Sequence, residues 1–87
     1  MTYRYEIQEF CLIEYDANNH QTFKSCRADK GFTYTGNNPD YQNQHFLITL
    51  ESNGKFCIYR ATCEEIVFQG ALIRRYTKTG APLHCFF

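Results

Sequence analysis

One stretch decides the fold of this chain: Phe46-Leu47-Ile48-Thr49-Leu50-Glu51-Ser52-Asn53-Gly54-Lys55-Phe56-Cys57-Ile58-Tyr59-Arg60-Ala61. Its Asn53-Gly54 dipeptide favours a two-residue type I′ turn, in which both turn residues need φ > 0. Pairing outward from that turn places Ser52 opposite Lys55 and puts three wholly apolar pairs on one face. A slip by one residue would scramble this separation. The sequence therefore predicts a β-hairpin whose core-facing residues are Phe46, Ile48, Leu50, Cys57 and Tyr59.

The residues before this hairpin also favour strands. Apolar side chains alternate at Tyr3, Tyr5 and Ile7, and the alternation then changes parity at Phe10 and Leu12. A bulge near residues 8–9 would reconcile the two halves, so we expect a strand over residues 3–15, with a helix as the alternative. Further along, the pattern predicts a turn at 16–20, a return strand at 21–28, a short extended segment at 32–35 and a polar loop at 35–44.

Residues 62–76 fit two structures. Thr62 and Glu65 match a helix capping box, and basic residues followed by Gly80 suit a helix end. Against a helix, apolar residues from Ile66 to Tyr76 cover every helical face, and Gly70 interrupts the middle. Two short strands bent at Gly70 explain the same residues and are favoured. A turn at 77–82 and a terminal strand at 83–87 complete the prediction.

These elements predict a mainly β fold in a single globular domain spanning residues 1–87. We expect a small antiparallel sheet or barrel of five to seven strands, with room for one short helix and an α+β fold as the alternative. The 17% aromatic content, from eight Phe and seven Tyr, supports a folded chain whose core depends on aromatic rings.

The five cysteines bear on the cellular compartment. An odd number of cysteines without a recognisable signal peptide argues against a disulfide framework. We therefore expect five reduced thiols, buried as small apolar side chains, in a cytoplasmic protein. The alternative is a secreted domain with two disulfides and one spare thiol.

Catalytic and metal-binding patterns are lacking in the sequence. No two cysteines have the C-x2-C spacing of a zinc knuckle, and no nucleophile elbow, HExxH helix or phosphate-binding glycine loop is present. We expect no enzyme activity, no cofactor and no metal. No apolar run approaches the length of a membrane span, so we expect no membrane partner.

What remains for function is docking on another macromolecule. The formal net charge is zero, and Tyr and Arg are residues that dominate interface hot spots. We expect a small protein-binding domain, an inhibitor or modulator of a larger host or defence complex of the kind that phages and mobile elements encode. The alternative is a single-stranded nucleic-acid binder, and a homodimer is a further arrangement to consider. The predicted contact residues are Phe32, Tyr34, Tyr41, Arg74 and Arg75.

Overall fold

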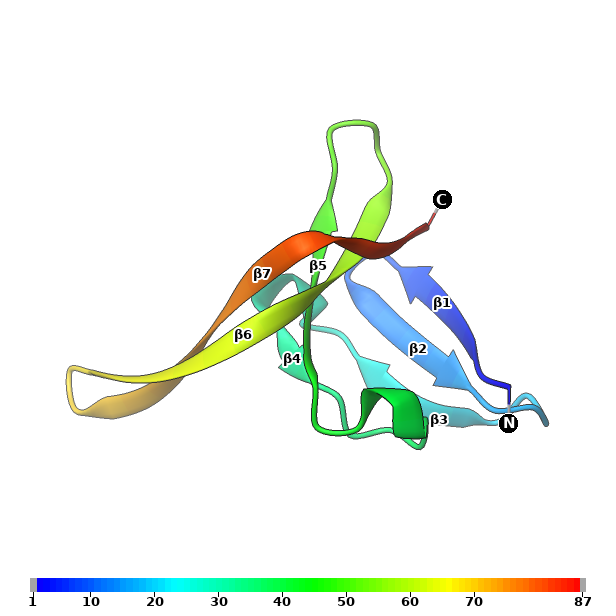
Figure 1. The fold of residues 1–87 in the computed structure, drawn as a ribbon, viewed down its shortest axis with the longest axis horizontal. Coiled ribbons are helices and arrows are strands. Elements are labelled where there is room, and N and C mark those ends of the chain that lie inside the picture. Colours follow the sequence, from blue (N-terminus) through cyan, green and yellow to red (C-terminus); the bar gives the residue numbers. More distant parts are fainter. Residues whose placement is uncertain (1, 87) are drawn as a thin grey trace.

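The computed structural model describes residues 2–86, which form two antiparallel sheets (Figure 1). The mainly β prediction is confirmed, and its seven strands are divided between two sheets. Within residues 2–86, the helical elements are two single 3-10 turns, η1 (Ala28–Lys30) and η2 (Pro39–Tyr41). The first sheet has the order β1 (Arg4–Gln8), β2 (Cys11–Tyr15), β3 (Gln21–Ser25). The second has the order β4 (Phe32–Thr33), β5 (His45–Leu50), β6 (Phe56–Phe68), β7 (Ala71–Phe86).

The parity change near the N-terminus marks a hairpin, so the predicted bulge within one strand is wrong. Gln8 pairs with Cys11, leaving two residues in the turn, the first of which, Glu9, has φ of 58°. A two-residue turn places odd residues of β1 opposite even residues of β2. Ile7 is therefore directly opposite Leu12, and both contribute to the core. The predicted turn at 16–20 is present, closed by the Asp16 carboxylate, which accepts from two backbone amides of the turn.

The β5–β6 hairpin forms, but its register differs by one residue from the prediction. Gly54 has φ of 84° and donates to the Glu51 carbonyl, while the Glu51 amide donates to the Lys55 carbonyl. This is a three-residue loop with glycine in the left-handed position, in place of the two-residue turn. Ile48 therefore pairs with Ile58, and Thr49 pairs with Cys57.

Because of the register change, the residues predicted to face the core lie on two different faces of the second sheet. Phe46 and Ile48 lie in the core, whereas Cys57 and Tyr59 are buried on the opposite face of the second sheet. Leu50, at the end of β5, is 53% exposed, so its predicted core position is wrong.

Residues 62–76 form strands, which excludes the helix and with it the α+β alternative. Strands β6 and β7 pair from Arg60–Thr79 out to Phe68–Ala71, and a two-residue turn of Gln69 and Gly70 joins them. Both turn residues have positive φ, 51° and 81°. The predicted turn at 77–82 lies instead inside β7, as an irregularity in the pairing opposite Tyr59.

The core lies between the two sheets and is largely aromatic. Leu12 from the first sheet and Phe46 and Ile48 from the second belong to one buried cluster. Phe23 bridges the sheets, since its ring centroid is 5.7 Å from that of Phe32 and 5.0 Å from that of Tyr34. Aromatic pairs at these distances contribute beyond the area they bury.

Two disulfides overturn the prediction of reduced cysteines. Cys57 and Cys85 are direct cross-strand partners in β6 and β7, with Cα atoms 4.0 Å apart. Cys11 and Cys26 bond at the end of the β2–β3 pairing, with Cα atoms 3.9 Å apart. Cys63 is the free thiol among residues 2–86. The prediction failed because it relied on an odd cysteine count, whereas cross-strand pairing decides which cysteines meet.

Candidate protein-docking site

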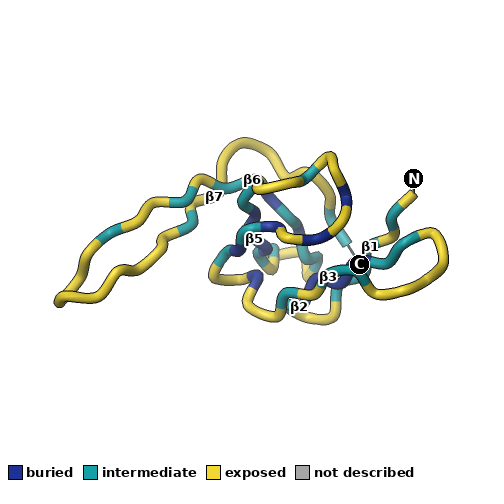
Figure 2. Tube along the Cα trace, turned by 90° about the horizontal axis from the view of Figure 1, so that it is seen from below, coloured by how far each residue is buried: buried dark blue, intermediate teal, exposed yellow. Residues whose placement is uncertain are grey.

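The paired outer parts of β6 and β7, residues 62–77, project from the rest of the molecule as a two-stranded ribbon, hereafter the arm (Figure 1). Figure 2 shows that buried residues are confined to the body, while the arm is mostly exposed. From the Ala61–Lys78 pair to the Phe68–Ala71 pair, the ribbon extends roughly 25 Å at the usual rise per residue. A two-stranded ribbon without a covering layer is marginally stable alone, so its base must be held by the body.

The base of the arm is fixed to the body by Tyr76. The Tyr76 hydroxyl is 3.0 Å from the Thr33 hydroxyl, which in turn is 2.9 Å from Nδ1 of His45. The Tyr76 ring also packs edge-on against the His45 ring, with centroids 5.8 Å apart. At Gly31 an added Cβ would lie 2.2 Å from Cβ of Tyr76, so only glycine permits this approach. The arm is therefore oriented by specific contacts at its base.

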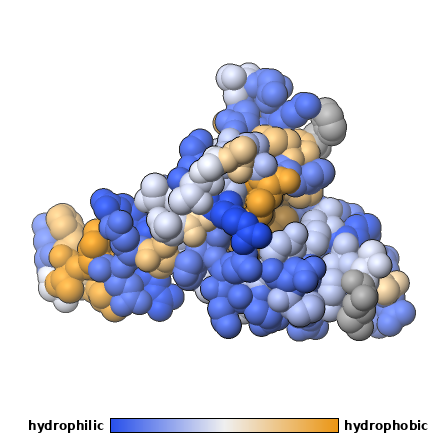
Figure 3. Space-filling model, in the orientation of Figure 1, coloured by the Kyte–Doolittle hydropathy of each residue, from blue (hydrophilic) through white to orange (hydrophobic). Residues whose placement is uncertain are grey.

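The outer end of the arm carries exposed apolar side chains on both of its faces. Val67 is 75% exposed and Leu72 is 63% exposed, and they pair on one face. On the other face, Phe68 is 60% and Ile73 is 41% exposed. Figure 3 shows the resulting hydrophobic area at the end of the arm. We call this set the arm tip: Ile66, Val67, Phe68, Ala71, Leu72 and Ile73.

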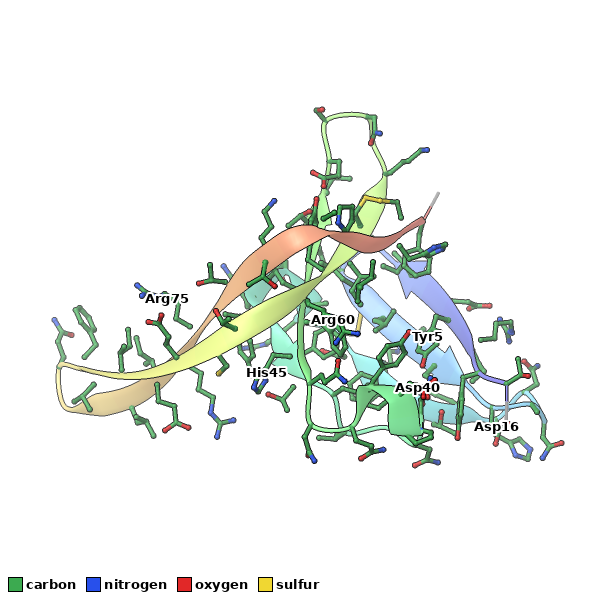
Figure 4. All side chains as sticks on the ribbon, in the orientation of Figure 1. Tyr5, Asp16, Asp40, His45, Arg60 and Arg75 are labelled. Carbon is green, nitrogen blue, oxygen red and sulfur yellow. A yellow bond between two sulfur atoms is a disulfide. The ribbon has the colours of Figure 1, made fainter. Side chains whose placement is uncertain are left out.

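Charged pairs follow directly behind the arm tip on both faces. Arg75, which lies on the arm in Figure 4, donates to the Glu64 carboxylate at 2.8 Å. Arg74 lies 3.7 Å from the Glu65 carboxylate. All four side chains are more than half exposed, so these pairs add little stability. The two glutamates and two arginines give the arm no net charge, and they lie between its apolar tip and the body.

The predicted contact residues divide into three groups in the structure. Arg74 and Arg75 are exposed on the arm, as expected of contact residues. Phe32 and Tyr34 are 7% and 2% exposed, so their predicted exposure is wrong. Phe32 lies in β4 and Tyr34 follows that strand, and Phe23 of the first sheet packs against both rings, so both are core residues. Tyr41 is half-buried and packs edge-on against Phe46.

The arm tip escaped the sequence prediction, although a signal for it exists. Acidic residues 64–65, three apolar residues, Gln69-Gly70, three apolar residues and basic residues 74–75 are arranged symmetrically about the turn. Such symmetry is what an antiparallel ribbon with cross-strand charge pairs requires. The prediction of a bend at Gly70 makes no use of this symmetry.

A second candidate surface is a cavity of about 410 Å³ between the two sheets. Its walls are mostly aromatic, and the exposed residues Leu83 and His84 of β7 also line it. The volume lies in the range of ligand-binding pockets. We call it the aromatic cavity; the other lining residues used below are Tyr5, Tyr34, Tyr41 and Phe86.

Two walls of the aromatic cavity are held by a buried carboxylate. Glu14 is fully buried and accepts hydrogen bonds from the hydroxyls of Tyr5 at 2.6 Å, Thr22 at 2.7 Å and Tyr34. The Asn38 side chain donates to the Tyr5 hydroxyl at 2.9 Å. Burial and the hydrogen bonds to Glu14 raise the pKa of Tyr5 and of Tyr34 above the usual tyrosine value. Both rings are therefore fixed before any ligand or partner arrives.

Residues 2–86 contain no group of three or more His, Cys, Asp or Glu side chains that could hold a metal ion. In the same part of the chain, no helix has the length and apolar character needed to cross a membrane. Comparison with known proteins assigns no family: no family model matches the sequence, and no curated protein or solved structure matches it significantly. The arm and the aromatic cavity are therefore the two candidate functional sites in the described part of the chain.

Proposed function

We propose that this chain is a small protein-binding domain that acts by docking rather than catalysis, with the arm as its contact element. The observation that supports this most strongly is the exposure of apolar side chains on both faces of the arm tip. Stable monomers rarely leave such groups clustered in water, and clustered exposed apolar groups mark interaction sites. An inhibitor or modulator of a larger protein complex would work through such a surface.

The two disulfides support a revised location for this activity. Disulfides persist in oxidising compartments and are rare in the reducing cytosol. We propose that the domain works in an oxidising environment, in place of the predicted cytoplasm. The link to phage or mobile-element inhibitors assumed reduced cytosolic thiols, and that assumption no longer holds.

The nucleic-acid alternative has lost its main contacts. Of the predicted contact residues, Phe32 and Tyr34 are buried, so bases cannot stack on them, and Arg74 and Arg75 each lie beside a glutamate. The neighbouring glutamates offset the charge of both arginines, which weakens the attraction of the arm for phosphate. A protein contact centred on the arm tip uses the exposed residues as they stand.

The test is affinity capture from an extract of the source organism, after nuclease treatment and without reductant. We expect the wild-type chain to retain one stoichiometric protein partner, and the double variant V67S/F68S to lose it. The matched control is Leu50→Ser, because Leu50 is a similarly exposed apolar residue outside the arm. Loss of all bound material on nuclease treatment would favour nucleic acid, and equal retention by V67S/F68S would contradict the role of the arm.

A further inference from the structure

The arm tip and the aromatic cavity are two apolar surfaces of the same chain, and each lacks an apolar partner among residues 2–86. Figure 3 shows them as separate hydrophobic areas, one at the end of the arm and one on the body beside β7. A cavity of about 410 Å³ has room for about a dozen water molecules at bulk density. Release of water from mostly aromatic walls would favour any apolar group that fits inside.

The arm tip cannot fill the aromatic cavity of its own chain. The arm leads away from the body (Figure 1), while the lining residues of the cavity place it between the two sheets. Contacts of Tyr76 with Thr33 and His45 fix the direction of the arm at its base. An arm tip that fills this cavity therefore has to come from a second molecule.

The charges of the chain favour a second copy as that molecule. The formal net charge is zero, so two copies do not repel each other. The arm tip carries no charged side chain, and no Asp, Glu, Lys or Arg lines the cavity. Immediately behind the tip, each arm offers both signs of charge, from Glu64–Arg75 and Glu65–Arg74.

We propose that the arm tip of one chain docks in the aromatic cavity of a second copy, with Phe68 as the inserted side chain. Phe68 is the largest apolar residue of the tip, is 60% exposed and belongs to the last cross-strand pair before the turn. The cavity is ready to receive it because Glu14 already holds Tyr5 and Tyr34 in place. This inference rests on the proposed role of the arm as a docking element and adds a second copy of the chain as a partner of the arm.

The contact is heterologous, because the tip and the cavity are different surfaces. Two such contacts close a dimer if each arm reaches the other chain, and otherwise chains grow in one direction. Because the tip and the cavity are different surfaces, each can be altered in a separate variant and the two variants can then be mixed. Symmetric arm-to-arm pairing predicts no recovery of association on mixing. All proteins in the test carry Cys63→Ser, which removes the free thiol of the arm and prevents intermolecular disulfides without reductant.

The experiment measures association by sedimentation equilibrium for three variants. Phe68→Ser removes the inserted side chain, and Leu83→Arg places a charge at the cavity, where Leu83 is 45% exposed and can be replaced without unfolding. Leu50→Arg makes the same change at an exposed leucine outside both surfaces. We expect F68S and L83R each to raise the dissociation constant by about tenfold or more, and L50R to leave it unchanged.

Mixing is the decisive measurement. F68S retains an intact cavity and L83R retains an intact arm tip, so an equimolar mixture should associate more tightly than either variant does alone. Failure of the mixture to associate, with both variants folded by circular dichroism, would overturn the tip-in-cavity arrangement. So would a wild-type chain that stays monomeric up to about 1 mM. If that monomer still captures a different protein through its arm, the proposed function stands and only the self-docking inference fails.

Discussion

Reduction of the two disulfides should unfold most of this domain under conditions in which the oxidised protein is stable. The Cys11–Cys26 bond closes a loop with a sequence separation of 15, and the Cys57–Cys85 bond closes one of 28. Loop-closure entropy then gives about 3 kcal/mol for the first and about 3.5 kcal/mol for the second. The loops do not overlap in sequence, so the two contributions should be close to additive.

That combined contribution is comparable with the whole stability of a small domain. Native domains are stable by about 5–15 kcal/mol, and a chain of this size lies toward the lower end because it buries a smaller fraction of its surface. The bonds also hold particular elements together. Cys57–Cys85 ties the end of β7, which carries Leu83 and Phe86 of the aromatic cavity, to β6.

The assay combines a thiol count with urea unfolding. Denatured, unreduced protein should show one reactive thiol, from Cys63, and fully reduced protein should show five. The double variants C11S/C26S and C57S/C85S should each lower the free energy of unfolding by about 3 kcal/mol or more. The control Cys63→Ser should leave that free energy within about 0.5 kcal/mol of the wild-type value.

Two results would refute this reasoning. Five reactive thiols in the unreduced protein would mean that the cross-strand cysteines do not form bonds. A reduced protein with an unchanged urea midpoint would mean that the bonds form but constrain nothing that packing does not already fix.

Three further predictions concern the interior and the arm. Replacing Glu14 by Ala leaves buried hydroxyls without an acceptor and should cost about 3 kcal/mol in urea unfolding, whereas Glu14→Gln, which keeps one acceptor oxygen, should cost less; equal effects would contradict the role of the hydrogen bonds. The folded state keeps Tyr5 and Tyr34 protonated above pH of about 10, where unfolded tyrosine ionises, so it binds more protons and its stability should fall as the pH rises further. Urea midpoints that do not change above that pH would refute this, and tyrosinate absorbance should rise together with unfolding. Gly31→Ala should destabilise the domain more than Gly70→Ala, since both have positive φ but only at Gly31 would the new methyl group overlap the arm; the latter should cost about 1–2 kcal/mol, from backbone strain alone.

Local sequence patterns determined the fold class and the positions of several turns. Alternating apolar residues and the Asn53-Gly54 dipeptide were sufficient to predict the β5–β6 hairpin, because strand period and turn chemistry are properties of neighbouring residues. Gly70 predicts a bend between two short strands, which is a hairpin turn in the structure, and the aromatic content predicts an aromatic core. The predicted end of the first strand failed, because a bulge and a two-residue hairpin produce the same change of parity.

Tertiary structure decided the properties that depend on residues far apart in the chain. Whether the hairpin loop at Gly54 has two or three residues depends on which face the first sheet covers. The three-residue loop sets the register of β5 and β6, and Cys57 and Ile48 therefore lie on opposite faces of the sheet. Cysteine pairing followed from strand pairing, which a count cannot supply. Phe32 is buried while Phe68 is exposed, although both are aromatic residues near a glycine, because only the body has a second sheet to cover its strands. Chemical type along the chain fixes which residues can serve in a core or an interface, and the packing of the two sheets decides which of them are left to meet a partner.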